Sequence, residues 1–319
     1  MYDPSTTALI VNPAAAAGRV GRSWSTLWPR LRDVLGDVDV RTSAAPGDAR
    51  RLAADALRDG AETVLSLGGD GTHNEVVNGF ADADVLDGTR RLGILPAGTG
   101  GDLRRMLHTG DDLVGAATEI RGRDAHPVDI GRLTFEGHDG TRTVRHFVNV
   151  ASFGMSGLVD RFANASSKRL GGRVTFLVAT FRALARWTGM DLELVIDGAP
   201  VSAADVQNVV LGNARYFGGG MHVCPNARLD DGFFDVVTLP ELSVLGAARH
   251  LPRVYRGTHL ELPGVQHLRA RRVEARATRG TAWLDVDGEA PGVAPVVAEV
   301  VPRAIRLIGV RADVLQGDA

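Results

Sequence analysis

The chain contains one cysteine, Cys224, and only 5% of its 319 residues are aromatic. A single cysteine excludes an internal disulfide, and nothing else points to an oxidising compartment. No stretch approaches the roughly 18 apolar residues of a membrane-spanning helix. The N-terminus also lacks the basic and apolar regions of a signal peptide. We therefore expect a cytoplasmic protein with no transmembrane segment, whose contact with any membrane is peripheral.

An excess of charge of one sign is missing as well. The formal net charge is -2 and the isoelectric point is about 6.5, so the surface has no general basic field and we expect no nucleic-acid partner. Glycine, in contrast, is abundant with 39 residues, which gather at 68–71, 98–101 and 218–220 without a period. Such clusters predict special turns and not a low-complexity segment.

The first third of the sequence alternates short β-like runs with amphipathic stretches. This alternation is typical of a parallel sheet covered by helices. Glycine-rich turns follow two of the runs, so we expect them at the carboxyl ends of strands, where open α/β sheets bind ligands. The expected strands are 7–11, 38–41, 63–67 and 92–95, and two of the expected helices are 49–58 and 73–80.

After about residue 128 the pattern changes to β-rich alternation, interrupted by two helical stretches at 172–187 and 243–256. This favours a second, mainly antiparallel domain. A last strand-like run at 304–310 is expected to return to the first domain. The predicted fold is thus α/β with two domains, 1–127 with 303–319, and 128–302. The expected strands of the second domain are 145–150, 191–196, 206–211, 233–239, 273–277 and 282–286.

The sequence GGDGT at 68–72 places an aspartate among glycines. Consecutive glycines let backbone N–H groups converge on anionic oxygens, and a helix that follows adds its dipole. A carboxylate beside phosphate is repelled unless a cation or a transferable proton lies there, so Asp70 is a magnesium-binding residue, a base, or both. The alternative is that Asp70 only caps the following helix.

The second turn, PAGTGGD at 96–102, repeats this chemistry. Gly98, Thr99 and Gly100 offer backbone and hydroxyl donors, and Asp102 offers a further oxygen ligand or a helix cap. Two such loops at neighbouring strand ends predict a nucleotide site.

Four motifs together carry a family resemblance. They are VNP at 11–13, GGDGTHNEVVNG at 68–79, PAGTGGD at 96–102 and DVDGE at 285–289. Their order resembles the catalytic region of the diacylglycerol kinase and sphingosine kinase superfamily, which is more distantly similar to NAD kinases. The stretches at 149–160 and 218–236 favour the lipid-kinase branch. The resemblance implies a Rossmann-like N-terminal domain and a β-rich C-terminal domain, with ATP and Mg²⁺ in the cleft between them.

The resemblance also implies roles for individual residues near the nucleotide. Asp129 matches an acidic position that bacterial lipid kinases join to Asp70 and Asp102 in a water-and-magnesium network, with Glu289 on the magnesium side. Lys168 and Arg173 match a stretch that supplies phosphate-binding cations, although a solvated helix face would have the same composition. The residues expected to line the nucleotide are Asn12, Arg19, Gly68, Gly69, Gly71, Thr72 and Thr99.

On the acceptor side, phosphoryl transfer needs a group that takes the proton of the attacking hydroxyl. The resemblance to bacterial diacylglycerol kinases assigns this role to Asp287, and that to sphingosine kinases assigns it to Asp70. A plain Asp-Gly hairpin turn is the alternative for Asp287. Asp160 matches a position that contacts the lipid headgroup in sphingosine kinases, and its alternative is a surface carboxylate.

Two loops depart from the family pattern, because Gly101 replaces an asparagine and Ala14 to Ala17 replace a serine-glycine pair. Both changes remove side-chain donors near the nucleotide. We expect a lipid kinase that acts on a lipid alcohol at the membrane surface. An NAD kinase and a non-catalytic nucleotide-binding protein remain the alternatives, and the choice of lipid and the existence of a homodimer are left open.

Overall fold

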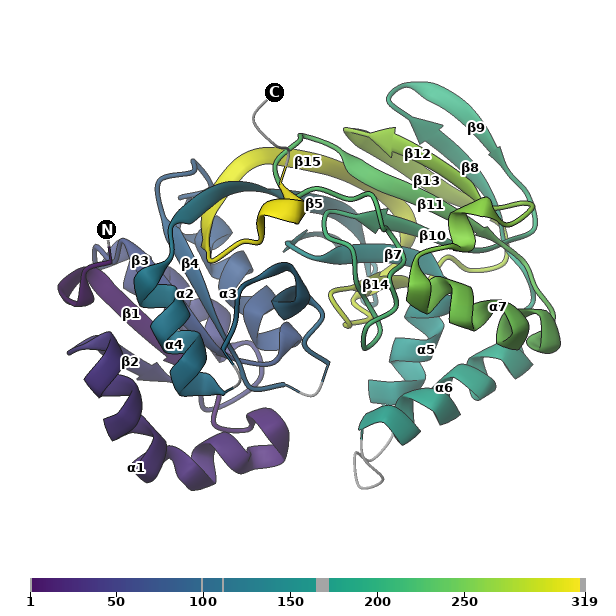
Figure 1. Ribbon diagram of the computed structural model, residues 1–319. Coiled ribbons are helices and arrows are strands. Elements are labelled where there is room, and N and C mark those ends of the chain that lie inside the picture. The colour runs from purple at the N-terminus through teal and green to yellow at the C-terminus, as the bar shows by residue number, and fades with distance from the viewer. Residues whose placement is uncertain (1, 99, 111, 165–171, 316–319) are drawn as a thin grey trace. The chain divides into compact units, whose positions relative to one another are not determined.

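The computed structural model describes residues 2–98, 100–110, 112–164 and 172–315. The chain divides into two compact units (Figure 1). The first comprises Met1–Ile130, Leu229–Asp231 and Val301–Ala319, and the second comprises Gly131–Arg228 and Gly232–Val300. Two long strands, β5 (Ala125–Gly137) and β15 (Gly292–Ile308), contribute residues to both units.

The first unit is built on a parallel sheet in the order β2-β1-β3-β4-β15. Its inner strands β1 and β3 are buried along their whole length, as expected for parallel strands covered on both faces. The chain leaves β1 toward β2 on one side and returns to β3 on the other, so the order reverses between β1 and β3. The bounds are β1 (Thr7–Val11), β2 (Asp39–Thr42), β3 (Thr63–Gly68) and β4 (Arg91–Pro96).

Helices cover both faces of this sheet. Leu65 and Leu67 of β3 pack in one core cluster with residues of α1 and α4, whereas Ser66 between them bonds His73 of α3. Successive strand residues point to opposite faces, so α3 lies on the face opposite α1 and α4 (Figure 1). The bounds are α1 (Ala15–Leu35), α2 (Asp48–Arg58), α3 (Asp70–Asp82), α4 (Leu113–Gly122), and the short helices η1 (Pro4–Thr6), η2 (Leu103–Met106) and η5 (Ala312–Val314).

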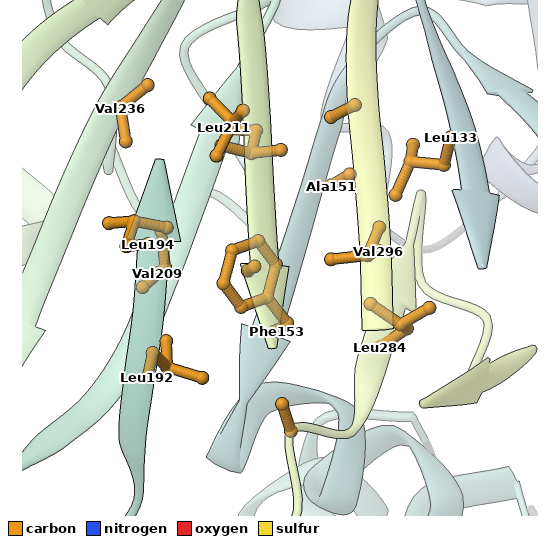
Figure 2. Packing of buried hydrophobic residues seen from close by; sticks show 14 of the residues in the cluster. Leu133, Ala151, Phe153, Leu192, Leu194, Val209, Leu211, Val236, Leu284 and Val296 are labelled. Carbon is orange, nitrogen blue, oxygen red and sulfur yellow. The ribbon is translucent and has the colours of Figure 1, made fainter. Parts of the chain in front are cut away.

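The second unit is a sandwich of two mainly antiparallel sheets. One contains β5, β6, β8, β9, β13 and β15, and the other has the order β12-β11-β10-β7-β14. Apolar side chains from the facing sides of both sheets form one core (Figure 2), including Phe153 of β7, Leu194 of β8 and Val296 of β15. The bounds are β6 (Arg142–Phe147), β7 (Val150–Gly154), β8 (Asp191–Ile196), β9 (Ala199–Ala203), β10 (Val206–Gly212), β11 (Phe234–Pro240), β12 (Gln266–Ala270), β13 (Arg272–Arg279) and β14 (Leu284–Val286).

Three α-helices accompany the sandwich, α5 (Met155–Asn164), α6 (Gly172–Arg186) and α7 (Val244–Arg256), together with the short η4 (His259–Glu261). The predicted class, an α/β domain followed by a β-rich antiparallel domain, is confirmed. None of the helices traced within the described ranges combines the length and apolar character needed to cross a bilayer.

Candidate functional site

Three loops meet at the carboxyl ends of β1, β3 and β4 in the first unit. The backbone N–H of Asn12, just after β1, donates to Leu67 O at 2.9 Å. The Asn12 side-chain Nδ2 donates to Thr72 Oγ1 at 2.9 Å, which ties this loop to the first turn of α3. Since the strand order reverses between β1 and β3, these loops flank the position where open α/β sheets bind ligands.

The loops after β3 and β4 pack backbone against backbone. Ala97 N donates to Gly68 O at 2.6 Å, and a Cβ on Gly98 would lie 2.8 Å from Gly69 Cα. A Cβ on Gly68 would collide with the side chain of Thr72. Only glycine fits this approach, so a ligand there meets backbone groups and the N-terminus of α3, which begins at Asp70. Such N-termini bind anions.

The Asp70 side chain bridges the two glycine-rich loops. Its Oδ2 accepts hydrogen bonds from Gly101 N at 2.9 Å and from Asp102 N at 3.4 Å. Its Oδ1 is buried and accepts no hydrogen bond from the residues that the structure describes. A buried carboxylate oxygen without a partner is costly, and a bound cation would satisfy it. The residue therefore fits a magnesium ligand better than a helix cap.

His73 lies directly below Asp70, one turn into α3. It is buried and shares a hydrogen bond of 2.8 Å with Ser66 Oγ. Burial lowers the pKa of His73 from 6.5 to about 4, although the negative charge of Asp70 acts in the opposite direction. The imidazole is thus neutral near pH 7 and presents no charge beneath the loop.

The other acidic residues expected near a metal have their own partners. Asp129 is fully buried, and its Oδ1 accepts from Arg303 N at 2.7 Å. Asp102 is buried, with Arg105 Nε at 3.8 Å from its Oδ1. Over the described ranges, no three acidic, histidine or cysteine side chains form a group that could hold an ion by themselves. A Mg²⁺ ion would take further ligands from phosphates and water, as is usual for this ion.

The other residues predicted to bind the nucleotide are Arg19, Thr99, Lys168 and Arg173. Arg19 is exposed and follows a break in α1 where Ala16, Ala17 and Gly18 have left-handed φ values of 54°, 56° and 78°. Thr99 and Lys168 lie outside the described residues, and Arg173 lies in α6 but its side chain also lies outside them. Their proposed roles stay predictions.

In the second unit, Asp287 lies in a hairpin turn after β14. Asp287 and Gly288 have φ values of 50° and 89°, and the flanking Val286 and Glu289 exchange backbone hydrogen bonds of 2.8 and 3.1 Å. These are the features of a type I′ turn. The Asp287 carboxylate also accepts from Val150 N at 3.0 Å and from Val148 N at 3.4 Å, so the backbone at the start of β7 and just before it orients this carboxylate. Glu289 faces Arg145 at 4.0 Å.

A buried acidic pair, which the sequence did not predict, lies behind this turn. Asp285 Oδ1 accepts from Gly288 N at 2.9 Å, and its Oδ2 accepts from Ser152 Oγ at 3.1 Å. The second acid is Asp160 of α5. The two acids are 125 residues apart in the sequence, so no local pattern indicated the pair.

Burial perturbs the pKa of both acids of this pair. Burial raises the pKa of Asp160 well above its usual range, and the nearby charge of Asp285 acts in the same direction. Burial also raises the pKa of Asp285, while hydrogen bonds from Asp160, Gly288 and Ser152 lower it. Of the two acids, Asp160 is therefore the one whose neutral form is favoured more strongly. It is buried, so the reading of this residue as a surface carboxylate is wrong.

Comparison with known families covers nearly the whole chain. Residues 6–133 match the diacylglycerol kinase catalytic domain, and residues 149–309 match the YegS C-terminal NAD kinase beta sandwich-like domain. A diacylglycerol kinase of Mycobacterium tuberculosis is 30% identical over 301 residues, which span 94% of this chain and 93% of the relative. A diacylglycerol kinase of Staphylococcus aureus is 29% identical over 287 residues, 90% of this chain and 87% of the relative.

Solved structures agree on the fold. The crystal structure of a putative diacylglycerol kinase from Bacillus anthracis has a TM-score of 0.75 at 24% identity, covering 97% of this chain and 96% of that one. Yeast NADH kinase complexed with NADH has a TM-score of 0.52 at 12% identity, covering 97% and 84%. The resemblance inferred from the motifs is confirmed: the chain belongs to the diacylglycerol kinase family, with a catalytic domain followed by an NAD kinase-like β-sandwich domain.

Proposed function

We propose that the protein transfers the γ-phosphoryl group of ATP to the hydroxyl of a lipid alcohol, such as diacylglycerol or a sphingoid base. Membership in a kinase family supports a nucleotide as the phosphoryl donor. The observation that carries the proposal is the position of Asp70, within a cradle that only glycine can form and with one buried oxygen left without a hydrogen-bond partner in the described chain.

In this proposal the first unit binds the donor. Backbone N–H groups of the glycine loops and the N-terminus of α3 receive the phosphate oxygens. Asp70 Oδ1 and Asp102 would hold Mg²⁺, which neutralises charge on the phosphates when it is bound. The neutral His73 leaves the negative charge of Asp70 undiminished near pH 7. Gly101 and Ala14 to Ala17 lack the side-chain donors of the family pattern. In this proposal backbone amides donate hydrogen bonds to the nucleotide in their place.

The second unit supplies the acceptor chemistry. Asp287, held by two backbone N–H groups, accepts the proton of the lipid hydroxyl as the oxygen attacks phosphorus. Glu289 is its magnesium-side partner. Asp160, whose pKa is raised by burial and by Asp285, contacts the lipid headgroup. Asp70 is the alternative base.

The test uses labelled ATP, Mg²⁺ and a panel of lipid alcohols. We expect label in a chloroform-soluble product for the parent, and a loss of kcat on the order of 100-fold or more in Asp70→Asn and in Asp287→Asn, as for a removed catalytic group. Asp37→Asn is the matched control, because the Asp37 side chain is 80% exposed and Asp37 is not among the residues assigned to the donor or the acceptor. Full transfer in Asp287→Asn would move the base to Asp70.

An NAD kinase is the second candidate, favoured by the fold shared with yeast NADH kinase. The same assay with NAD as acceptor would then give a water-soluble labelled product and none in chloroform. A non-catalytic nucleotide-binding protein is a third, motivated by the changed loops. It would bind ATP in a calorimeter and transfer no label to any acceptor, which would overturn the proposed kinase.

A further inference from the structure

Helix α7 (Val244–Arg256) contributes no buried residue to the core of its unit. It is nevertheless well anchored. The Ser243 side chain caps its N-terminus by accepting from Gly246 N, and near its C-terminus Val254 O accepts from His222 N at 3.1 Å. Gly257, with φ of 73°, ends it. Figure 1 shows α7 outside the strands of the sandwich, so its composition is not explained by packing.

The outward face of α7 is apolar along one side. Val244, Leu251 and Tyr255 are 47%, 43% and 48% exposed, and Leu245 is 81% exposed. Residues 244, 251 and 255 follow one another at spacings of seven and four, which aligns them on a helix. An ordinary surface helix turns such a stripe toward the core. In α7 the stripe is turned toward solvent.

A basic stripe lies beside the apolar one. Arg249, Arg253 and Arg256 are spaced by four and three residues and are all exposed, so they too align. The sequence of α7, VLGAARHLPRVYR, contains no acidic residue. The remaining side of α7 is only partly exposed. It is formed by Gly246, Ala247, His250 and Val254. Apolar and cationic stripes thus share the exposed face.

We propose that α7 docks the protein on an anionic lipid bilayer. Leucine, valine and tyrosine side chains would enter the boundary between headgroups and acyl chains, while the arginines contact lipid phosphates, as in interfacial amphipathic helices. Docking by the same stripes on those of a second copy of this chain is disfavoured, because α7 contains no acidic residue that could complement its arginines. The docking proposal rests on the proposed function, because a lipid acceptor would lie in the bilayer.

The test is sedimentation of the full-length protein with vesicles of phosphatidylcholine alone, or mixed with phosphatidylglycerol in equal parts. We expect binding to the anionic vesicles that weakens with added salt. The variant Arg249→Gln/Arg253→Gln/Arg256→Gln should lose on the order of 100-fold in partition coefficient, because each juxtamembrane arginine contributes about 1 kcal/mol. Leu245→Glu/Leu251→Glu should also abolish binding.

Matched controls lie elsewhere on the same unit. Val144→Glu changes a valine that is 44% exposed on β6, and Arg276→Gln changes an arginine whose side chain is 74% exposed on β13. Both should bind anionic vesicles like the parent. Equal loss in the controls, or full binding by the α7 variants, would overturn the proposal. If the parent does not bind vesicles and light scattering shows a dimer that the α7 variants do not form, the partner of α7 is a second copy of the chain. That result would also overturn the proposal.

Failure of docking and failure of the proposed kinase are distinguishable. The α7 variants should phosphorylate a water-soluble short-chain diacylglycerol as fast as the parent, because α7 contains none of the residues assigned to donor or acceptor. If the parent transfers phosphate but does not bind vesicles, the docking proposal alone is removed. If the parent binds vesicles but transfers phosphate to no lipid, the proposed kinase alone is removed.

Discussion

His73 shows how burial of an ionisable side chain affects the stability of the protein. Its pKa is about 4 in the folded protein and about 6.5 in an unfolded chain. Between these values the unfolded state binds a proton that the folded state does not. The stabilising effect of the neutral imidazole is therefore complete above about pH 6.5 and is lost as the pH falls to about 4.

This loss should amount to about 3 kcal/mol in the free energy of unfolding. Urea denaturation across that pH range measures it. The variant His73→Gln should show a shallower decrease, because it lacks the titrating group. An equally steep decrease in the variant would assign the slope to other groups.

Asp160 has the opposite sign. Its folded pKa is raised, so above the unfolded value of about 3.8 the folded state keeps a proton that the unfolded state has released. The free energy of unfolding should therefore decrease as the pH rises from about 3.8 to the raised pKa of Asp160 in the folded protein. The variant Asp160→Asn imitates the neutral carboxyl, and we expect a higher Tm than the parent at neutral pH with a difference that shrinks in acid. A difference in Tm that is constant with pH would contradict a raised pKa of Asp160.

At the scale of elements, the start of α1 contains the least regular backbone near the candidate site. Ala16 and Ala17 both have left-handed φ values, which cost roughly 1–2 kcal/mol for each residue other than glycine. Arg22 Nη1 donates to Ala17 O at 3.2 Å and helps to hold this geometry. The loop that departs from the family pattern is thus a strained one.

Ala17→Gly should relieve part of this strain and raise the free energy of unfolding by about 1 kcal/mol. Ala17 is exposed, so no packing is lost. Ala248→Gly is the control, because Ala248 is also exposed but lies inside helix α7, where glycine costs about 1 kcal/mol. Chemical denaturation should shift the two variants in opposite directions. Destabilisation of both would exclude the left-handed backbone at Ala17.

Element boundaries show where local sequence patterns are sufficient. The strands expected at 7–11, 63–67 and 92–95 correspond to β1, β3 and β4, since short apolar runs bounded by turn residues predict buried strands well. Helix α3 begins at Asp70 and not at residue 73, so the glycine motif includes the first turn of the helix. Helix α5 was not predicted, because the glycine and the serine in MSGLVD weaken its helical pattern.

At the scale of the whole molecule, average charge conceals local organisation. A net charge of -2 argues against a nucleic-acid partner, yet α7 gathers three arginines and no acid on one helix. The compact units also differ from the expected domains, because Leu229–Asp231 belongs to the first unit through the bond from Leu229 N to Val314 O of 3.0 Å. A short segment of this kind carries no signal in a local sequence pattern.

The sequence by itself determined the fold class, the family and the glycine loops, because these depend on residues close together in the chain. Tertiary structure decided the bond between Asn12 and Thr72, 60 residues apart, the partnership of Asp160 with Asp285, and the outward direction of the apolar stripe on α7. Tertiary packing determines which side chains are exposed. Burial and partners distant in the sequence determine the pKa values of ionisable groups. Neither can be obtained from the order of residues within one segment.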